Sequence, residues 1–172
     1  MLKPVFSQIT VGMLAILTLG SCSNVTIDQY EATARTRYTW QVKYAYDLVD
    51  EPLPRLETFG SNSLLNRNGL KPSGRIIGPD DKGLWWPILP PRPSVDEIEQ
   101  RKQSSTEKFS KPELLKSVKY KITYSSGGQR RTLPTNYQVY RQVVKTYTSG
   151  TPLELTLGVD DNSVTKAEPV GN

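Results

Sequence analysis

The chain of 172 residues contains few side chains of the kinds that usually catalyse reactions. It has no histidine, which removes the commonest general base and the commonest metal ligand. Paired carboxylates are the simplest remaining route to acid–base chemistry, and Asp80-Asp81 and Asp160-Asp161 are adjacent in the sequence. Both pairs lie in turn-like or terminal polar stretches, where acids are usually solvated. We therefore predict a non-enzymatic protein without cofactor or metal, and a hydrolase using Asp80 or Asp81 is only a remote alternative.

Basic residues form a second pattern. They occupy the polar positions of stretches that alternate like strands, and the candidates are Arg37, Lys43, Lys119 and Lys121. If these strands share a sheet, its solvent face is basic and suits an anionic envelope polymer or lipid headgroups. The simpler interpretation is an ordinary solvated face, because lysine is common there.

A tryptophan- and proline-rich segment is the most distinctive internal stretch. Four prolines in seven residues enforce an extended path without the backbone donors that a sheet needs. The segment either docks a protein partner or lies at a bilayer interface, or it is a stiff crossover packed by its tryptophans. Its candidate residues for partner binding are Trp85, Trp86, Pro87, Pro90, Pro91, Arg92 and Pro93.

The single cysteine, Cys22, ends a stretch with the features of an export signal. Lys3 precedes an apolar run over residues 11–19, and Gly20 and Ser21 lead into the cysteine. The run is too short for a membrane-spanning helix, which needs roughly 18 apolar residues. The stretch could therefore be a lipoprotein signal, an ordinary cleaved signal or an uncleaved anchor.

Residues 1–22 resemble the signal of bacterial lipoprotein precursors. The resemblance implies removal of residues 1–21, acylation of Cys22 with chains such as palmitate, and location on a membrane facing the periplasm or extracytoplasmic space. Several acyl chains hold a protein stably on a bilayer, since each buried methylene contributes about 0.8 kcal/mol. The resemblance to lipoprotein precursors covers only the signal, and it implies no activity for the mature domain.

The net charge of the chain and its expected location outside the cytoplasm limit the kinds of partner that it could bind. The net charge of +5 is a mild excess and is compatible with anionic headgroups or glycans. Outside the cytoplasm we expect no nucleic acid partner. The main functional hypothesis is a lipoprotein that binds or supports a membrane or envelope protein complex. The alternative is a binding module for an anionic envelope polymer or headgroups.

Hydrophobic periodicity predicts the elements of the mature domain. Period-two alternation over residues 37–48 predicts a long strand with one buried face. The residues expected on that face are Tyr38, Trp40, Val42, Tyr44, Tyr46 and Leu48. Further strands are expected over residues 118–124 and 153–159, with a hairpin turn at residues 125–128. Residues 137–147 fit either a helical face or a strand, and their content of Tyr, Val and Thr favours a strand.

Two smaller elements are also predicted. Residues 75–77 and 84–86 flank a turn-rich stretch and form a hairpin. Ser94 and Glu97 have the spacing of a capping box, which predicts a helix from Val95 to about Gln103. The rest of residues 52–93 is expected to be a long irregular connection rich in Pro and Gly.

Together these elements predict a β-rich α+β fold: an antiparallel sheet of about four main strands with one helix and that irregular connection. Residues 1–21 are the signal, residues 22–36 the lipidated cysteine and a tether, residues 37–159 a single domain, and residues 160–172 a polar tail.

Overall fold

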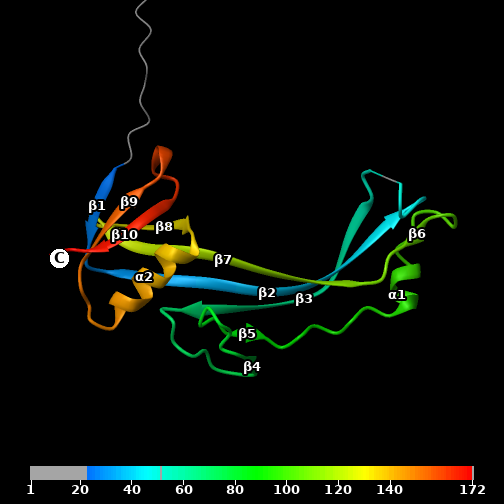
Figure 1. Ribbon diagram of the computed structural model, residues 1–172, viewed down its shortest axis with the longest axis horizontal. Coiled ribbons are helices and arrows are strands. Elements are labelled where there is room, and N and C mark those ends of the chain that lie inside the picture. The colour runs from blue at the N-terminus through cyan, green and yellow to red at the C-terminus, as the bar shows by residue number, and fades with distance from the viewer. Residues whose placement is uncertain (1–22, 51, 172) are drawn as a thin grey trace, which may run out of the picture.

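The computed structural model describes residues 23–50 and 52–171 (Figure 1). The signal-like stretch and Cys22, on which the prediction of lipidation rests, lie outside the described residues. The elements are β1 (Asn24–Ile27), β2 (Tyr30–Ala45), β3 (Arg55–Arg67), β4 (Ile76–Ile77), β5 (Trp86–Pro87), α1 (Val95–Glu99), β6 (Lys108–Phe109), β7 (Glu113–Ser126), β8 (Gln129–Thr135), α2 (Tyr137–Tyr147), β9 (Leu153–Leu157), the 3-10 helix η1 (Val159–Asp161) and β10 (Val164–Pro169).

The main sheet has eight strands rather than the expected four or so. Seven follow the order β1-β9-β10-β8-β7-β2-β3, and β6 pairs with the end of β2. The sheet is mixed, because β10 runs parallel to β8 where Val164 pairs with Thr135. The predicted antiparallel sheet of about four strands was therefore wrong. The stretches expected to be tether, irregular connection and tail supply β1, β3 and β10, and the remaining additional strands are β6 and β8.

Three long strands, β2, β3 and β7, run along the length of the molecule (Figure 1). The predicted buried face of β2 is present, with Tyr38, Val42 and Tyr44 almost inaccessible to solvent. Tyr46 and Leu48 were also expected on this face, but both lie beyond the end of β2 and are 61% and 43% exposed. β3 occupies part of the expected irregular connection. The sequence of β3 is polar and has no strand-like hydrophobic pattern. It still forms a strand, because it pairs with β2 through backbone hydrogen bonds that do not depend on side-chain type.

The expected tether and tail are parts of the sheet. The Leu157 amide donates to the Ser23 carbonyl at 2.8 Å, and β1 pairs with β9 from its first residue. At the other end of the chain, β10 buries Val164 and Ala167 in the core. From Ser23 onward, the stretch expected to be a tether therefore belongs to the sheet.

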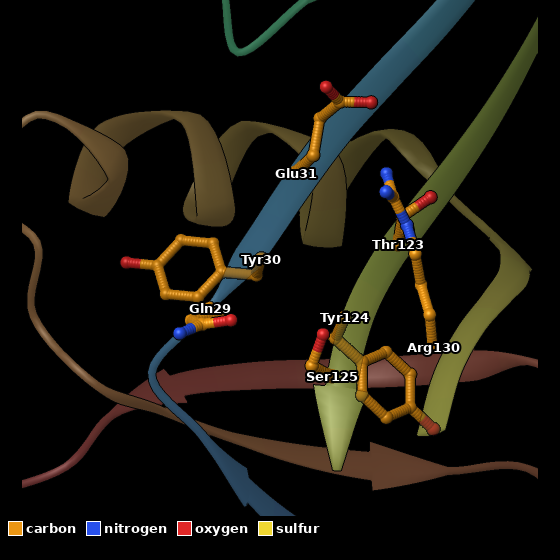
Figure 2. Close-up of a pocket in the computed structure, with 7 residues that line it drawn as sticks. All are labelled: Gln29, Tyr30, Glu31, Thr123, Tyr124, Ser125 and Arg130. Carbon is orange, nitrogen blue, oxygen red and sulfur yellow. The ribbon is translucent and has the colours of Figure 1, made fainter. Parts of the chain in front are cut away.

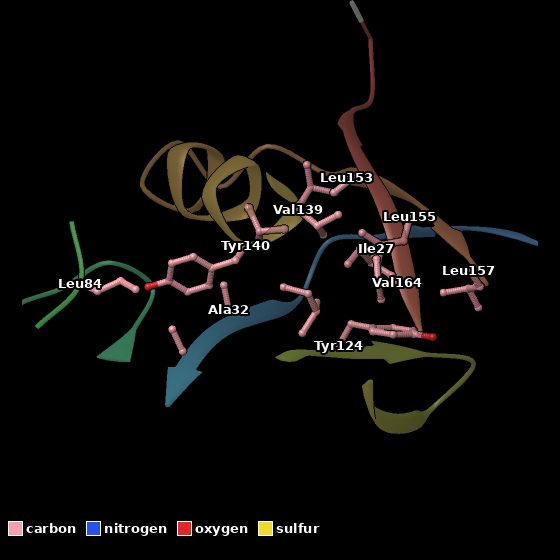
Figure 3. Close-up of a cluster of buried hydrophobic side chains, with 14 residues drawn as sticks. Ile27, Ala32, Leu84, Tyr124, Val139, Tyr140, Leu153, Leu155, Leu157 and Val164 are labelled. Atoms are coloured by element: carbon pink, nitrogen blue, oxygen red, sulfur yellow. The ribbon is translucent and has the colours of Figure 1, made fainter. Parts of the chain in front are cut away.

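Residues 137–147 form the helix α2, so the predicted strand was wrong. The Asn136 side chain caps the helix by accepting from the Val139 amide at 3.0 Å. Val139, Tyr140 and Val143 recur at helical spacing on one face, and all three are buried in the larger of two hydrophobic cores, with residues of β1, β2, β7, β9 and β10. Figure 3 shows Val139 and Tyr140 in this main core. Tertiary burial of this face outweighs the strand preference of the individual residues.

A second, smaller core lies at the other end of the long strands. It contains Val42, Tyr44 and Ile98, with Phe59 and Phe109 packed against it. Ile98 belongs to α1, where Ser94 and Glu97 form the predicted capping box, although the helix ends at Glu99 rather than near Gln103.

Two predicted hairpins are confirmed. β4 pairs with β5, and β7 pairs with β8 across Gly127 and Gly128. Both glycines have positive φ, which other residues adopt only at a cost.

Candidate functional site

The sheet has one packed face and one uncovered face along β2 and β7. Side chains alternate across a strand, so the even-numbered residues of β2 pack inward, and the odd-numbered residues point to the other side. Residues directly opposite each other in an antiparallel pair point to the same side of the sheet, so the odd-numbered residues of β7 lie beside the odd-numbered residues of β2. We call the group of four exposed cations on this side the basic face: Arg35, Arg37, Lys119 and Lys121.

The pairing of β2 with β7 fixes how these cations lie. Arg35 is directly opposite Lys119, Thr33 is opposite Lys121, and Arg37 is opposite Ser117. Arg35, Arg37, Ser117 and Lys119 line one small hollow of about 40 Å³. Among the ion pairs formed within the described part of the chain, none includes a residue of the basic face. The four positive charges therefore face solvent without a carboxylate partner there.

Sequence reasoning identified three of these four residues. Arg35 was missed because it was assigned to the tether, although extending the alternation of β2 by one pair upstream would have included it. Lys43 was predicted for the same site, but it lies six residues beyond Arg37 in β2. At about 3.3 Å per residue this is roughly 20 Å, so the structure does not bring Lys43 into the group.

A neutral ion pair lies beside the basic face. The Arg67 Nη1 atom is 2.9 Å from Glu31 Oε2, which satisfies both charges. Next to Glu31 is a polar hollow of about 190 Å³, where the side chain of Arg130 extends past Thr123 (Figure 2). Drug-sized ligands usually need about 300 Å³ or more. The hollow is thus smaller than the usual site for a drug-sized ligand.

The opposition of Arg35 and Lys119 lowers the stability of the fold. Like charges directly opposite in a sheet are destabilising, by a few tenths to about 1 kcal/mol. Natural proteins break such local rules mainly at functional sites. Several cations on one surface also raise the local concentration of anions. The basic face is therefore suited to holding an anionic ligand.

Trp86 of the tryptophan- and proline-rich segment is a packing residue. Its ring centroid is 5.0 Å from that of Tyr38, and its Nε1 donates to Asp80 Oδ2 at 2.8 Å. Asp80 also accepts from the amides of Lys82 and Leu84 through its other oxygen. Both oxygens of this candidate carboxylate therefore hold the β4–β5 turn.

The remainder of the segment lies along the packed side of the long strands. Trp85 is half-buried, and its carbonyl accepts from Thr36 Oγ1 at 2.8 Å and Asn66 Nδ2 at 3.0 Å. Among the prolines, Pro87, Pro90 and Pro93 are buried and Pro91 is exposed, as is Arg92. Ile88 and Leu89 are the large aliphatic side chains of the segment, and both are exposed.

The second acid pair is also structural in position. Asp160 and Asp161 lie in η1 with positive φ, and Asp161 Oδ1 accepts from the Ser23 hydroxyl. Among the described residues, no three Cys, Asp or Glu side chains are close enough to hold a metal ion. No helix within the described ranges is long and apolar enough to span a membrane.

Comparisons with models of protein families, with curated proteins and with solved structures found no match for this chain.

Proposed function

We propose that this protein is a non-enzymatic binding module whose basic face holds a phosphate- or carboxylate-rich ligand of the cell envelope. The observation that carries the proposal is the pairing of Arg35 with Lys119, flanked by Arg37 and Lys121, on an uncovered sheet face. These charges lack carboxylate partners within the described residues, so an external anion would relieve their mutual repulsion.

Such a ligand has two sources, a soluble anionic polymer or the headgroups of a bilayer. A chain that begins at Ser23 retains every described contact and lacks the cysteine, so it tests the face without an anchor. Its binding to sodium polyphosphate and to phosphatidylglycerol vesicles should be measured by titration calorimetry and by sedimentation, respectively. Binding in only one arm identifies the source.

The key variant combines Arg35→Thr and Lys119→Thr. Exposed ion pairs contribute about 0.2–1 kcal/mol each, so losing two should weaken binding by about 2- to 30-fold. The matched control combines Lys145→Thr and Lys166→Thr, which removes the same charge from exposed positions on α2 and β10. Equal weakening in the two double variants, or binding insensitive to salt, would refute the proposal.

The lipid anchor is the second part of the proposal. It rests on the resemblance of residues 1–22 to lipoprotein signals, with Cys22 as the acylated residue. Metabolic labelling with a fatty acid should mark the wild type and fail to mark Cys22→Ser. An unlabelled wild-type protein recovered with residues 1–21 intact would contradict the anchor and the envelope location.

Support of a protein complex is a second candidate function. The observation in its favour is the pair Ile88 and Leu89, which are 41% and 51% exposed on a segment held rigid by buried prolines. Cross-linking in native membranes with wild type and with Ile88→Asp/Leu89→Asp tests it. Unchanged cross-linked species would exclude this segment as the contact.

A further inference from the structure

A further hollow lies at the end of the long strands that carries the smaller core, near α1 and β6. Its volume is about 380 Å³, within the range of about 300–1,000 Å³ that is usual for small-molecule sites. The residues that line it are Arg92, Pro93, Val95, Ile98, Phe109, Ser110, Lys111 and Pro112. We call it the α1 groove.

Most of the α1 groove is apolar and preformed. Ile98 is 1% exposed and belongs to the small core, whereas Val95 is 64% exposed. Pro93 and Pro112 have no backbone N–H and a fixed φ, so their part of the lining is rigid and poor in hydrogen-bond donors. Such a surface gains from contact with an apolar group and loses little conformational entropy on binding.

The polar exceptions in the lining are mainly cationic. Arg92 and Lys111 each precede one of the two prolines, and both side chains are exposed. Neither forms an ion pair within the described residues, and none of the residues that line the groove is acidic. The Arg92 guanidinium is 5.7 Å from the Trp40 ring centroid, a contact that restricts its position.

We propose that the α1 groove binds an anionic amphiphile, a molecule with a short apolar body and one carboxylate or phosphate group. The apolar body packs against Val95 and Phe109, above the buried Ile98, and the anion pairs with Arg92 and Lys111. Neither the lipid anchor nor the basic face is needed for this site.

Three ten-carbon probes of different charge test the inference. Sodium decanoate, decan-1-ol and decyltrimethylammonium should be titrated, below micelle-forming concentrations, into a ¹⁵N-labelled chain that begins at Ser23. Decanoate should shift the amide signals of Val95, Ile98 and Phe109 and bind about 2- to 30-fold more tightly than decan-1-ol, the range expected from two exposed ion pairs. Decyltrimethylammonium should bind more weakly than both.

Variants separate this site from the basic face. Arg92→Gln/Lys111→Gln should remove the preference for decanoate over decan-1-ol and leave polyphosphate binding unchanged. Arg35→Thr/Lys119→Thr should weaken polyphosphate binding and keep the preference for decanoate over decan-1-ol. The inference is overturned by equal binding of the three probes, by shifts confined to other regions, or by loss of polyphosphate binding in the groove variant.

Discussion

Arg35 of β2 lies directly opposite Lys119 of β7, with both side chains on the uncovered face of the sheet. Arg35→Thr should therefore relieve repulsion and raise the free energy of unfolding by about 0.2–1 kcal/mol at low salt. Urea denaturation at two salt concentrations measures this, and the gain should shrink as salt screens the charges.

Lys166 provides the matched control for this prediction. It is also an exposed strand cation, but it pairs with Glu168 at 2.8 Å. Lys166→Thr should give no gain in stability. A gain equal to that of Arg35→Thr would show that general charge, and not the cross-strand pair, is responsible.

Trp86→Ala should lower the free energy of unfolding by about 3–5 kcal/mol, the usual cost of truncating a buried Trp. The ring is 8% exposed, packs on Tyr38 and donates to Asp80. Leu89→Ala, three residues away and 51% exposed, should change stability by no more than about 0.5 kcal/mol. Similar losses in the two variants would mean that Trp86 is not a core residue.

Glu107→Gln should make thermal stability less dependent on pH. Arg55 donates to this carboxylate at 3.0 Å and 3.3 Å, and the Gln103 amide donates at 2.8 Å. These hydrogen bonds, that from Arg55 first, hold the pKa of Glu107 below its usual value of 4.5. The charged form is thus favoured in the folded protein, and its stabilisation is present above pH 4.5 and is lost as pH falls through the lower folded-state pKa.

The melting temperature should accordingly differ between wild type and Glu107→Gln at pH 7, with wild type higher. The difference should decrease steadily below pH 4.5, because Gln resembles the protonated acid. Glu113→Gln is the control, since this exposed carboxylate has no ion pair within the described residues. A pH-independent difference for Glu107 would refute the role of its charge.

Ending the chain after Asn162 should abolish cooperative unfolding. This change removes β10, which pairs with β9 and buries Val164 and Ala167 at 1% and 6% exposure. Ending the chain after Val170 keeps the strand and should leave the melting temperature nearly unchanged. Circular dichroism on heating distinguishes these outcomes, and a cooperative transition in the shorter chain would contradict the assignment of β10 to the core.

The local sequence pattern predicted the structure correctly where the side-chain periodicity and the backbone preference favour the same element. Alternation predicted the buried positions Tyr38, Val42 and Tyr44, and the spacing of Ser94 and Glu97 predicted the capping box. The glycines at 127 and 128 predicted the β7–β8 turn. Each of these signals comes from residues close in sequence, so no tertiary contact is needed to interpret it.

Pattern failed where the partner strand or core decides the structure. β3 is polar and β1 is short, yet each forms hydrogen bonds along an available strand edge. Residues 137–147 have strand-like composition, but the core buries Val139, Tyr140 and Val143 on one helical face. Because the tether was assumed to be unstructured, Arg35 was left out of the candidate site.

The sequence by itself determined which residues are available: four cations at alternating positions, one cysteine after a signal-like stretch, and no histidine. Only the tertiary structure decided that Arg35 faces Lys119, that Lys43 is remote from them, and that Trp86 is buried while Leu89 is exposed. The physical reason is that residue type and periodicity are local properties, whereas strand register and burial depend on which distant segments supply the neighbouring backbone and side chains.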